Sequence, residues 1–168
     1  IKGQYSFTTL NDKSLSFTMS YATDSASLNS ITLNLIEPNP NITAPLTSDN
    51  KVTWANIAPS TDLIDEIYDG YFNRKFIIRE DSAPKTFKFQ FALSDNLSIE
   101  DYSGHMLVKD KNTQEEFFLL RFPQGIDAQN QRIDYKYALE GNTLTLYPNR
   151  VWQYERAVYP ITIYAPIN

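Results

Sequence analysis

The sequence contains no cysteine and only one histidine among its 168 residues. Without cysteine the chain cannot form disulfides, thiolate metal sites or a cysteine nucleophile. His105 alone cannot supply the two or three imidazoles that most catalytic zinc and non-haem iron sites use. These absences exclude large groups of metalloenzymes and cysteine-dependent enzymes, and we expect no cofactor.

Positive charge is also in short supply, because 15 Lys and Arg residues stand against 20 Asp and Glu, for a formal net charge of −5. Nucleic-acid binding depends on neutralising phosphates, so we expect no nucleic-acid partner. No apolar run approaches the roughly 18 to 20 residues that span a bilayer, so we expect no membrane insertion.

Motifs for phosphate binding and for nucleophilic catalysis are missing as well. The chain has five glycines, and they form neither a Walker loop nor G-x-G-x-x-G nor a G-x-S-x-G elbow. The acid pairs Glu100-Asp101 and Glu115-Glu116 would serve glycoside hydrolysis only across a sugar-sized cleft, with the carboxyl groups about 5 to 9.5 Å apart. A β-rich chain contains such pairs by chance, so we expect a protein that is not an enzyme.

The sequence does contain a strict alternation of apolar and polar residues, which places every second side chain on one face of a strand. Residues 87–93 (FKFQFAL) are the clearest case, since three Phe and a Leu face one way while Lys88 and Gln90 face the other. Turn signals separate such runs at intervals of about 8 to 12 residues. The pattern predicts an all-β fold, an antiparallel β-sandwich. The other runs are residues 15–21, 31–35, 135–139, 143–147 and 159–164.

Two segments leave alternatives open. Residues 60–68, flanked by proline and glycine, fit a short helix, but Ile64, Glu66 and Tyr68 alternate as they would in a strand. Residues 36–50 carry three prolines and read as a connector. The connector either joins N-terminal strands over residues 1–50, as a small sheet or subdomain, to a main sandwich over residues 51–168, or it crosses over within one continuous domain.

The densest cluster of oxygen ligands consists of Asp62, Asp65, Glu66 and Asp69. Calcium takes six to eight oxygen ligands from such residues and from carbonyl groups, but this spacing fits no EF-hand loop. A solvated, turn-forming segment is the alternative. We therefore expect no metal site, and these four residues are the calcium candidates that the sequence offers.

Aromatic residues are abundant, with 11 Tyr, 10 Phe and 2 Trp. Most of the phenylalanines lie on the inward phase of alternating strands and account for a core. Tyr68, Tyr71, Tyr102, Trp152 and Tyr154 fall in turn-like contexts where exposure is expected. Exposed aromatic planes are the usual surface on which sugar rings stack, so the alternative function is a carbohydrate-binding module that uses Trp152, Tyr154, Tyr71 and Tyr102.

The order of features over residues 52–168 resembles a β-sandwich module of large bacterial secreted and cell-wall-associated proteins, of the Rhs/YD-repeat and wall-associated type. The shared features are an F-x-F-x-L strand at residues 87–93, Phe122-Pro123 followed by Asp127 and an Asn turn, Trp152, and a closing Tyr-Pro-Ile-Thr-Ile run at residues 159–163. The chain departs from the family at Tyr164-Ala165, where the family has Asp-Pro.

The resemblance implies a non-catalytic structural or adhesive module of a secreted or cell-surface protein, with an extracellular location. Its role would be to space or present the neighbouring domains of the same polypeptide, which are its expected partners, together with a glycan or another surface protein. The resemblance supplies no catalytic residues.

Overall fold

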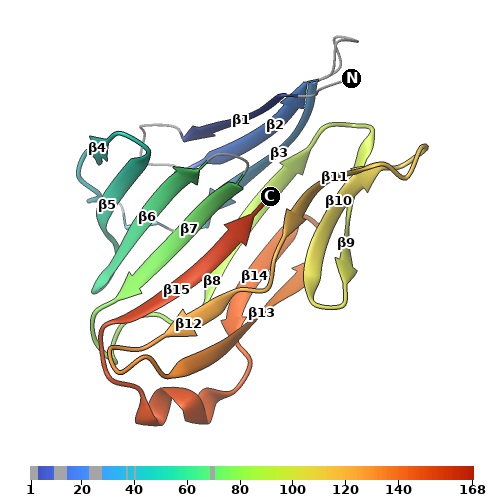
Figure 1. Ribbon diagram of the computed structural model, residues 1–168. Coiled ribbons are helices and arrows are strands. Elements are labelled where there is room, and N and C mark those ends of the chain that lie inside the picture. The colour runs from blue at the N-terminus through green and yellow to red at the C-terminus, as the bar shows by residue number, and fades with distance from the viewer. Residues whose placement is uncertain (1–3, 10–14, 23–27, 37, 40, 69–70) are drawn as a thin grey trace.

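The computed structural model describes residues 4–9, 15–22, 28–36, 38–39, 41–68 and 71–168. These residues form fifteen strands and one short 3-10 helix, and the fold is all-β (Figure 1). The part described holds no helix long and apolar enough to cross a membrane. The elements are β1 (Gln4–Thr9), β2 (Phe17–Ala22), β3 (Leu28–Leu35), β4 (Leu46–Ser48), β5 (Lys51–Ala58), β6 (Thr61–Tyr68), β7 (Tyr71–Ile78), β8 (Phe87–Leu93), β9 (Leu97–Tyr102), β10 (His105–Asp110), β11 (Glu116–Leu120), β12 (Gln124–Ile126), β13 (Arg132–Glu140), β14 (Thr143–Pro148), η1 (Val151–Arg156) and β15 (Ile161–Ile167).

Hydrogen-bonded neighbours follow the order β1-β2-β3-β8-β14-β13-β12-β15-β7-β6-β5-β4. All of these pairings are antiparallel, as the alternating sequence predicted. A three-stranded arm, β9-β10-β11, joins β15 through the pair Leu120 and Ile167. In Figure 1 the last strand, β15, lies between β7 and β12.

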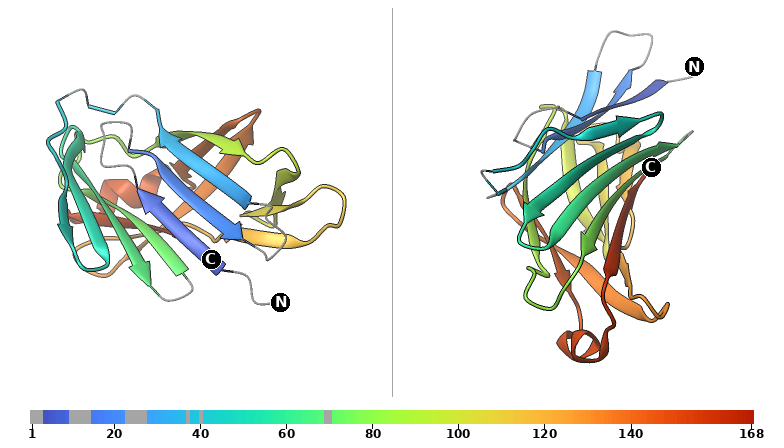
Figure 2. Two further views of the ribbon diagram at one scale, coloured as in Figure 1. Left: turned by 90° about the horizontal axis from the view of Figure 1, so that it is seen from above. Right: turned by 90° about the vertical axis from the view of Figure 1, so that its left-hand side faces the viewer.

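The sheet curls into an open half-barrel, and the predicted sandwich of two separate sheets is not confirmed (Figure 2). The reason is β13, which belongs to both halves of the sheet. Its first residues, Arg132 to Asp134, pair with β12, and the residues from Tyr135 to Glu140 pair with β14. Because one strand continues from one half into the other, the sheet turns a corner without breaking.

The concave side of the curl is filled by side chains from both halves. Phe17 of β2 stacks on Phe72 of β7 with ring centroids 3.6 Å apart, and Phe76 of β7 stacks on Phe87 of β8 at 4.1 Å. In β8 the residues Phe87, Phe89 and Phe91 are buried while Lys88 and Gln90 are exposed, as predicted. Each fully buried ring contributes roughly 1.5–3 kcal/mol through removal of apolar surface from water.

Strand pairing shows what one of the two ambiguous segments forms and where the N-terminal strands lie. Residues 61–68 form strand β6, so the helical interpretation of this segment is wrong. Among the described residues of the polar connector, only Leu46–Ser48 form a strand, β4, near the end of the connector. Strand β3 pairs with β8 over five residues, which places β2 and β3 in the same sheet as the later strands.

Candidate functional site

The short helix η1 separates β14 from β15 and presents its side chains in two directions. Trp152 and Arg156 point outward, and Trp152 is 51% exposed. Tyr154 is only 5% exposed, so the expectation that Tyr154 is available to a ligand is wrong. Its ring packs edge-on against Tyr135 with centroids 6.1 Å apart, and burial raises the pKa of its hydroxyl. A helix with three residues per turn cannot expose positions 152 and 154 on the same side.

Trp152 lines a hollow of about 360 Å³ between η1 and the start of β13. This volume lies near the lower end of the range for small-ligand sites, about 300–1,000 Å³. The surrounding side chains combine one exposed indole with guanidinium and amide groups, which can donate hydrogen bonds to a polar ligand. They include Asp127, Gln131, Arg132, Trp152, Gln153 and Arg156, a set that we call the Trp152 groove.

Asp127 organises one wall of the Trp152 groove. Its carboxylate accepts hydrogen bonds from the backbone N–H groups of Gln129 and Gln131 at 2.8 Å, and of Val158 at 3.0 Å. Burial by itself would raise the pKa of Asp127, but these three donors outweigh it and the pKa is lowered. The ionised side chain therefore ties the turn after β12 to the segment that leaves η1.

A second polar network holds the other wall. Asp134 Oδ1 accepts from Arg132 Nε at 2.9 Å, and Gln153 bonds to both the backbone N–H of Asp134, at 2.8 Å, and its Oδ2, at 3.2 Å. Arg150 Nε lies 3.9 Å from the same carboxylate. The side chains of Gln153 and Arg132 are thus positioned by β13.

The other aromatic candidates lie elsewhere. Tyr71 is 37% exposed, and its ring stacks on that of Tyr68 with centroids 4.9 Å apart. It lines a different hollow, together with Arg121 and Pro166, near the C-terminal end of β15. Tyr102 is 60% exposed at the β9–β10 turn and lines neither hollow. The predicted set of four rings is therefore not brought together, and Trp152 is the member that sits in a groove with hydrogen-bonding partners.

The acidic calcium candidates do not share a face of β6. Asp65 is buried, whereas Asp62 and Glu66 lie on the outer face. Each pairs with a cation of its own from β7 or the residue after it: Asp62 with Arg79, Asp65 with Arg74, and Glu66 with Lys75. Asp69 lies outside the described residues. No group of three acids, histidines or cysteines suited to a metal ion occurs in the part of the chain that the structure describes.

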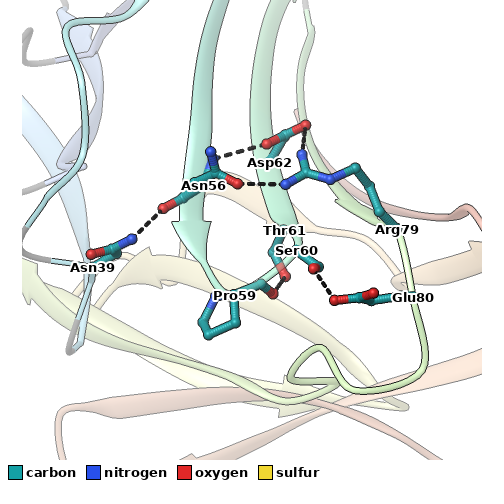
Figure 3. Close-up of polar contacts among 8 residues, drawn as sticks. All are labelled: Asn39, Asn56, Pro59, Ser60, Thr61, Asp62, Arg79 and Glu80. Carbon is teal, nitrogen blue, oxygen red and sulfur yellow. Dashed lines mark hydrogen bonds and ion pairs between the residues drawn. The ribbon is translucent and has the colours of Figure 1, made fainter.

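Asp62 has a structural role in a polar network where β5 ends and β6 begins (Figure 3). Asn56 has a positive φ of 53° within the irregular stretch of the β5–β6 ladder between Trp54 and Ala58. Its backbone N–H donates to Asp62 Oδ1 at 2.8 Å, and Arg79 donates to both Asp62 and the side-chain carbonyl of Asn56. Asn39 donates to the Asn56 carbonyl at 3.0 Å, which fixes the connector to the sheet.

The candidates His105, Glu100 and Asp101 also have local partners. His105 Nδ1 accepts from the backbone N–H of Phe122 at 3.1 Å. Glu100 pairs with Lys109 at 2.6 Å, and Asp101 Oδ1 accepts from the backbone N–H of Gly104 at 2.7 Å. Consecutive residues of a strand point to opposite faces, so Glu100 and Asp101 cannot flank one sugar unit.

Sequence reasoning missed the arginines of the Trp152 groove. Trp152 and Arg156 are four residues apart in the sequence, and the Arg156 guanidinium lies 5.7 Å from the centre of the Trp152 ring. The run RVWQYER at residues 150–156 held this signal. Comparisons with protein-family models, with curated protein sequences and with solved structures found no match.

Proposed function

We propose that the protein is a non-catalytic structural module of a secreted or cell-surface bacterial protein, which spaces or presents neighbouring domains. The order of motifs that resembles the Rhs/YD-repeat and wall-associated type supports this proposal. The curl adds support, because its two halves pack through stacked rings as the layers of a sandwich module do. The observation that carries the proposal is the way in which β15 is held.

β15 is bonded along both edges. Seven of its residues pair with β7, from Ile161 to Ile167, and three pair with β12. Beyond this ladder Asn168 exchanges backbone hydrogen bonds with Leu119 at 2.7 and 3.1 Å, and its side chain accepts from Arg121 Nε at 2.7 Å. Tension applied at Asn168 therefore loads many hydrogen bonds at once, as a spacer between domains requires.

Single-molecule pulling tests this role, because the absence of cysteine allows one attachment thiol to be introduced at a chosen position. Load between Asn168 and Ser82→Cys, just beyond β7, shears β15 along its partner. Load between Asn168 and Asn142→Cys, at the β13–β14 turn, pulls strands apart from one end. We expect a higher unfolding force in the first geometry. Equal forces in the two geometries would contradict a load-bearing role.

The second candidate function is carbohydrate binding. The observation that favours it is the exposed indole of Trp152 in a groove with amide and guanidinium donors. A glycan array with the native chain, Trp152→Ala and Tyr102→Ala tests it. We expect binding that Trp152→Ala abolishes and Tyr102→Ala preserves. Silence across the array would reject this function.

A further inference from the structure

The charges around the Trp152 groove are arranged to attract an anion, although the chain as a whole carries a net charge of −5. Arg132 and Arg156 line the hollow. Arg150 lies beside it, 3.9 Å from the Asp134 carboxylate that also pairs with Arg132. The acidic lining residue is Asp127, whose two oxygens already accept three backbone N–H groups. Glu155 of η1 does not line the hollow.

The two arginines of the groove, Arg132 and Arg156, differ in their ion-pair partners. Arg132 has a carboxylate, Asp134, at 2.9 Å. Among the described residues Arg156 forms no ion pair, and its guanidinium lies 5.7 Å from the centre of the Trp152 ring. An arginine held over an aromatic ring keeps its planar fork of donors oriented for a carboxylate, which it binds in a bidentate manner.

We propose that the Trp152 groove binds a carboxylate-bearing saccharide, with a sugar ring stacked on Trp152 and its carboxylate held by Arg156. This inference rests on the second proposed function, carbohydrate binding. A ring and a charge recognised together account for both features of the groove, since a neutral sugar would leave the guanidinium of Arg156 without a counter-ion. Gln131 and Arg132 are placed to donate to the hydroxyl groups of the sugar.

A panel of uronic-acid and sialic-acid oligosaccharides, each beside its own methyl ester, tests the proposal, because the ester removes the charge and keeps the sugar. We expect at least one acid to bind about tenfold more tightly than its ester. Arg156→Gln should abolish that preference, and Trp152→Ala should weaken binding of both forms. Lys136→Gln, which removes an exposed cation of β13 that does not line the groove, is the control and should change nothing.

Fluorescence gives an independent measurement, since Trp152 is exposed and the other tryptophan, Trp54, is fully buried. A saccharide stacked on Trp152 should protect the exposed component of the emission from acrylamide quenching. Thermal melting of each variant confirms that it is folded.

The outcomes separate the two levels of the proposal. Equal, Trp152-dependent binding of acids and esters would overturn the acidic specificity and leave sugar binding intact. No binding of any sugar would overturn both. Equal binding of polyglutamate in place of the saccharide would show attraction by charge alone and would also overturn the proposal.

Discussion

Asp65 and Arg74 face one another across the β6–β7 ladder and form a two-pronged ion pair inside the core, with Nε and Nη2 each 2.8 Å from a carboxylate oxygen. Both side chains are at most 3% exposed. The guanidinium lies 5.4 Å from the ring centre of Phe17 and 6.0 Å from that of Phe89, so the charge pair sits among aromatic rings that belong to the other half of the sheet.

Removing one partner of this buried ion pair should strongly destabilise the fold. Arg74→Met leaves the Asp65 carboxylate buried without a counter-charge, and we expect a loss of about 3–5 kcal/mol in the free energy of unfolding. The double variant Asp65→Leu/Arg74→Met should recover most of that loss. Urea denaturation measures both.

The outer pair of the same two strands is the matched control. Lys75→Met removes the partner of Glu66 at a position that is partly exposed, with side chains 19% and 12% exposed, and should cost at most about 1 kcal/mol. A cost equal to that of Arg74→Met would contradict the assignment of a special role to the buried pair.

Asp127 should couple the stability of the chain to the shape of the Trp152 groove. Asp127→Ala leaves three backbone N–H groups without their acceptor, so we expect a loss of about 2–4 kcal/mol. Amide exchange of Gln129, Gln131 and Val158 should accelerate in this variant. Normal exchange at these three positions would show that the turn is held by other contacts.

Asp110 should make stability depend on pH in the acid range. The backbone N–H of Thr113, the side-chain amide of Asn96 and the backbone N–H of Asn112 lower its pKa to about 2. Because the folded pKa lies below the unfolded one, ionised Asp110 stabilises the fold above pH ~4, and this contribution is lost as the pH falls towards the folded pKa. The stability difference between native protein and Asp110→Asn should therefore shrink between pH ~5 and pH ~2. NMR titration of the Asp110 carboxyl group locates the pKa directly.

Gly104 and Gly141 both adopt a positive φ, but replacing each by alanine should destabilise the fold to different extents. Gly104 and Gly141 have φ values of 88° and 59°. An added Cβ at Gly141 has no atom within 4 Å, so Gly141→Ala should cost only the backbone term of about 1 kcal/mol. At Gly104 the Cβ would collide with the ring of Phe122, which packs edge-on against His105. Gly104→Ala should therefore lower the melting temperature further than Gly141→Ala does.

Alternation along the chain was enough to predict six of the strands, β2, β3, β8, β13, β14 and β15, and their antiparallel character, because each of these strands has one face in the core. Phe87, Phe89 and Phe91 show this most clearly. The path of the sheet was not predictable in the same way. It depends on pairings between distant segments, such as β3 with β8 and β7 with β15, and on β13 continuing through the corner.

The alternation of apolar and polar residues contained a signal for the buried ion pair. Asp65 stands on the same phase as Leu63, and Arg74 on the same phase as Phe72 and Phe76. An acid and a base on the apolar phases of successive strands predict a pair in the core. Asp65 also belongs to the acidic cluster with Asp62, Glu66 and Asp69, and that grouping along the sequence pointed to calcium instead. In contrast, the inward turn of Tyr154 follows from a 3-10 helix that no periodic pattern marked.

The corner strand β13 also determines how the molecule can come apart. A protein made of two independent sheets can lose one of them and keep the other as a partly folded intermediate. Here the detachment of either half of the sheet disrupts the same nine-residue strand, β13. Proteolytic nicking and heat should therefore convert the native chain to the unfolded one in a single step, with no half-sized resistant fragment.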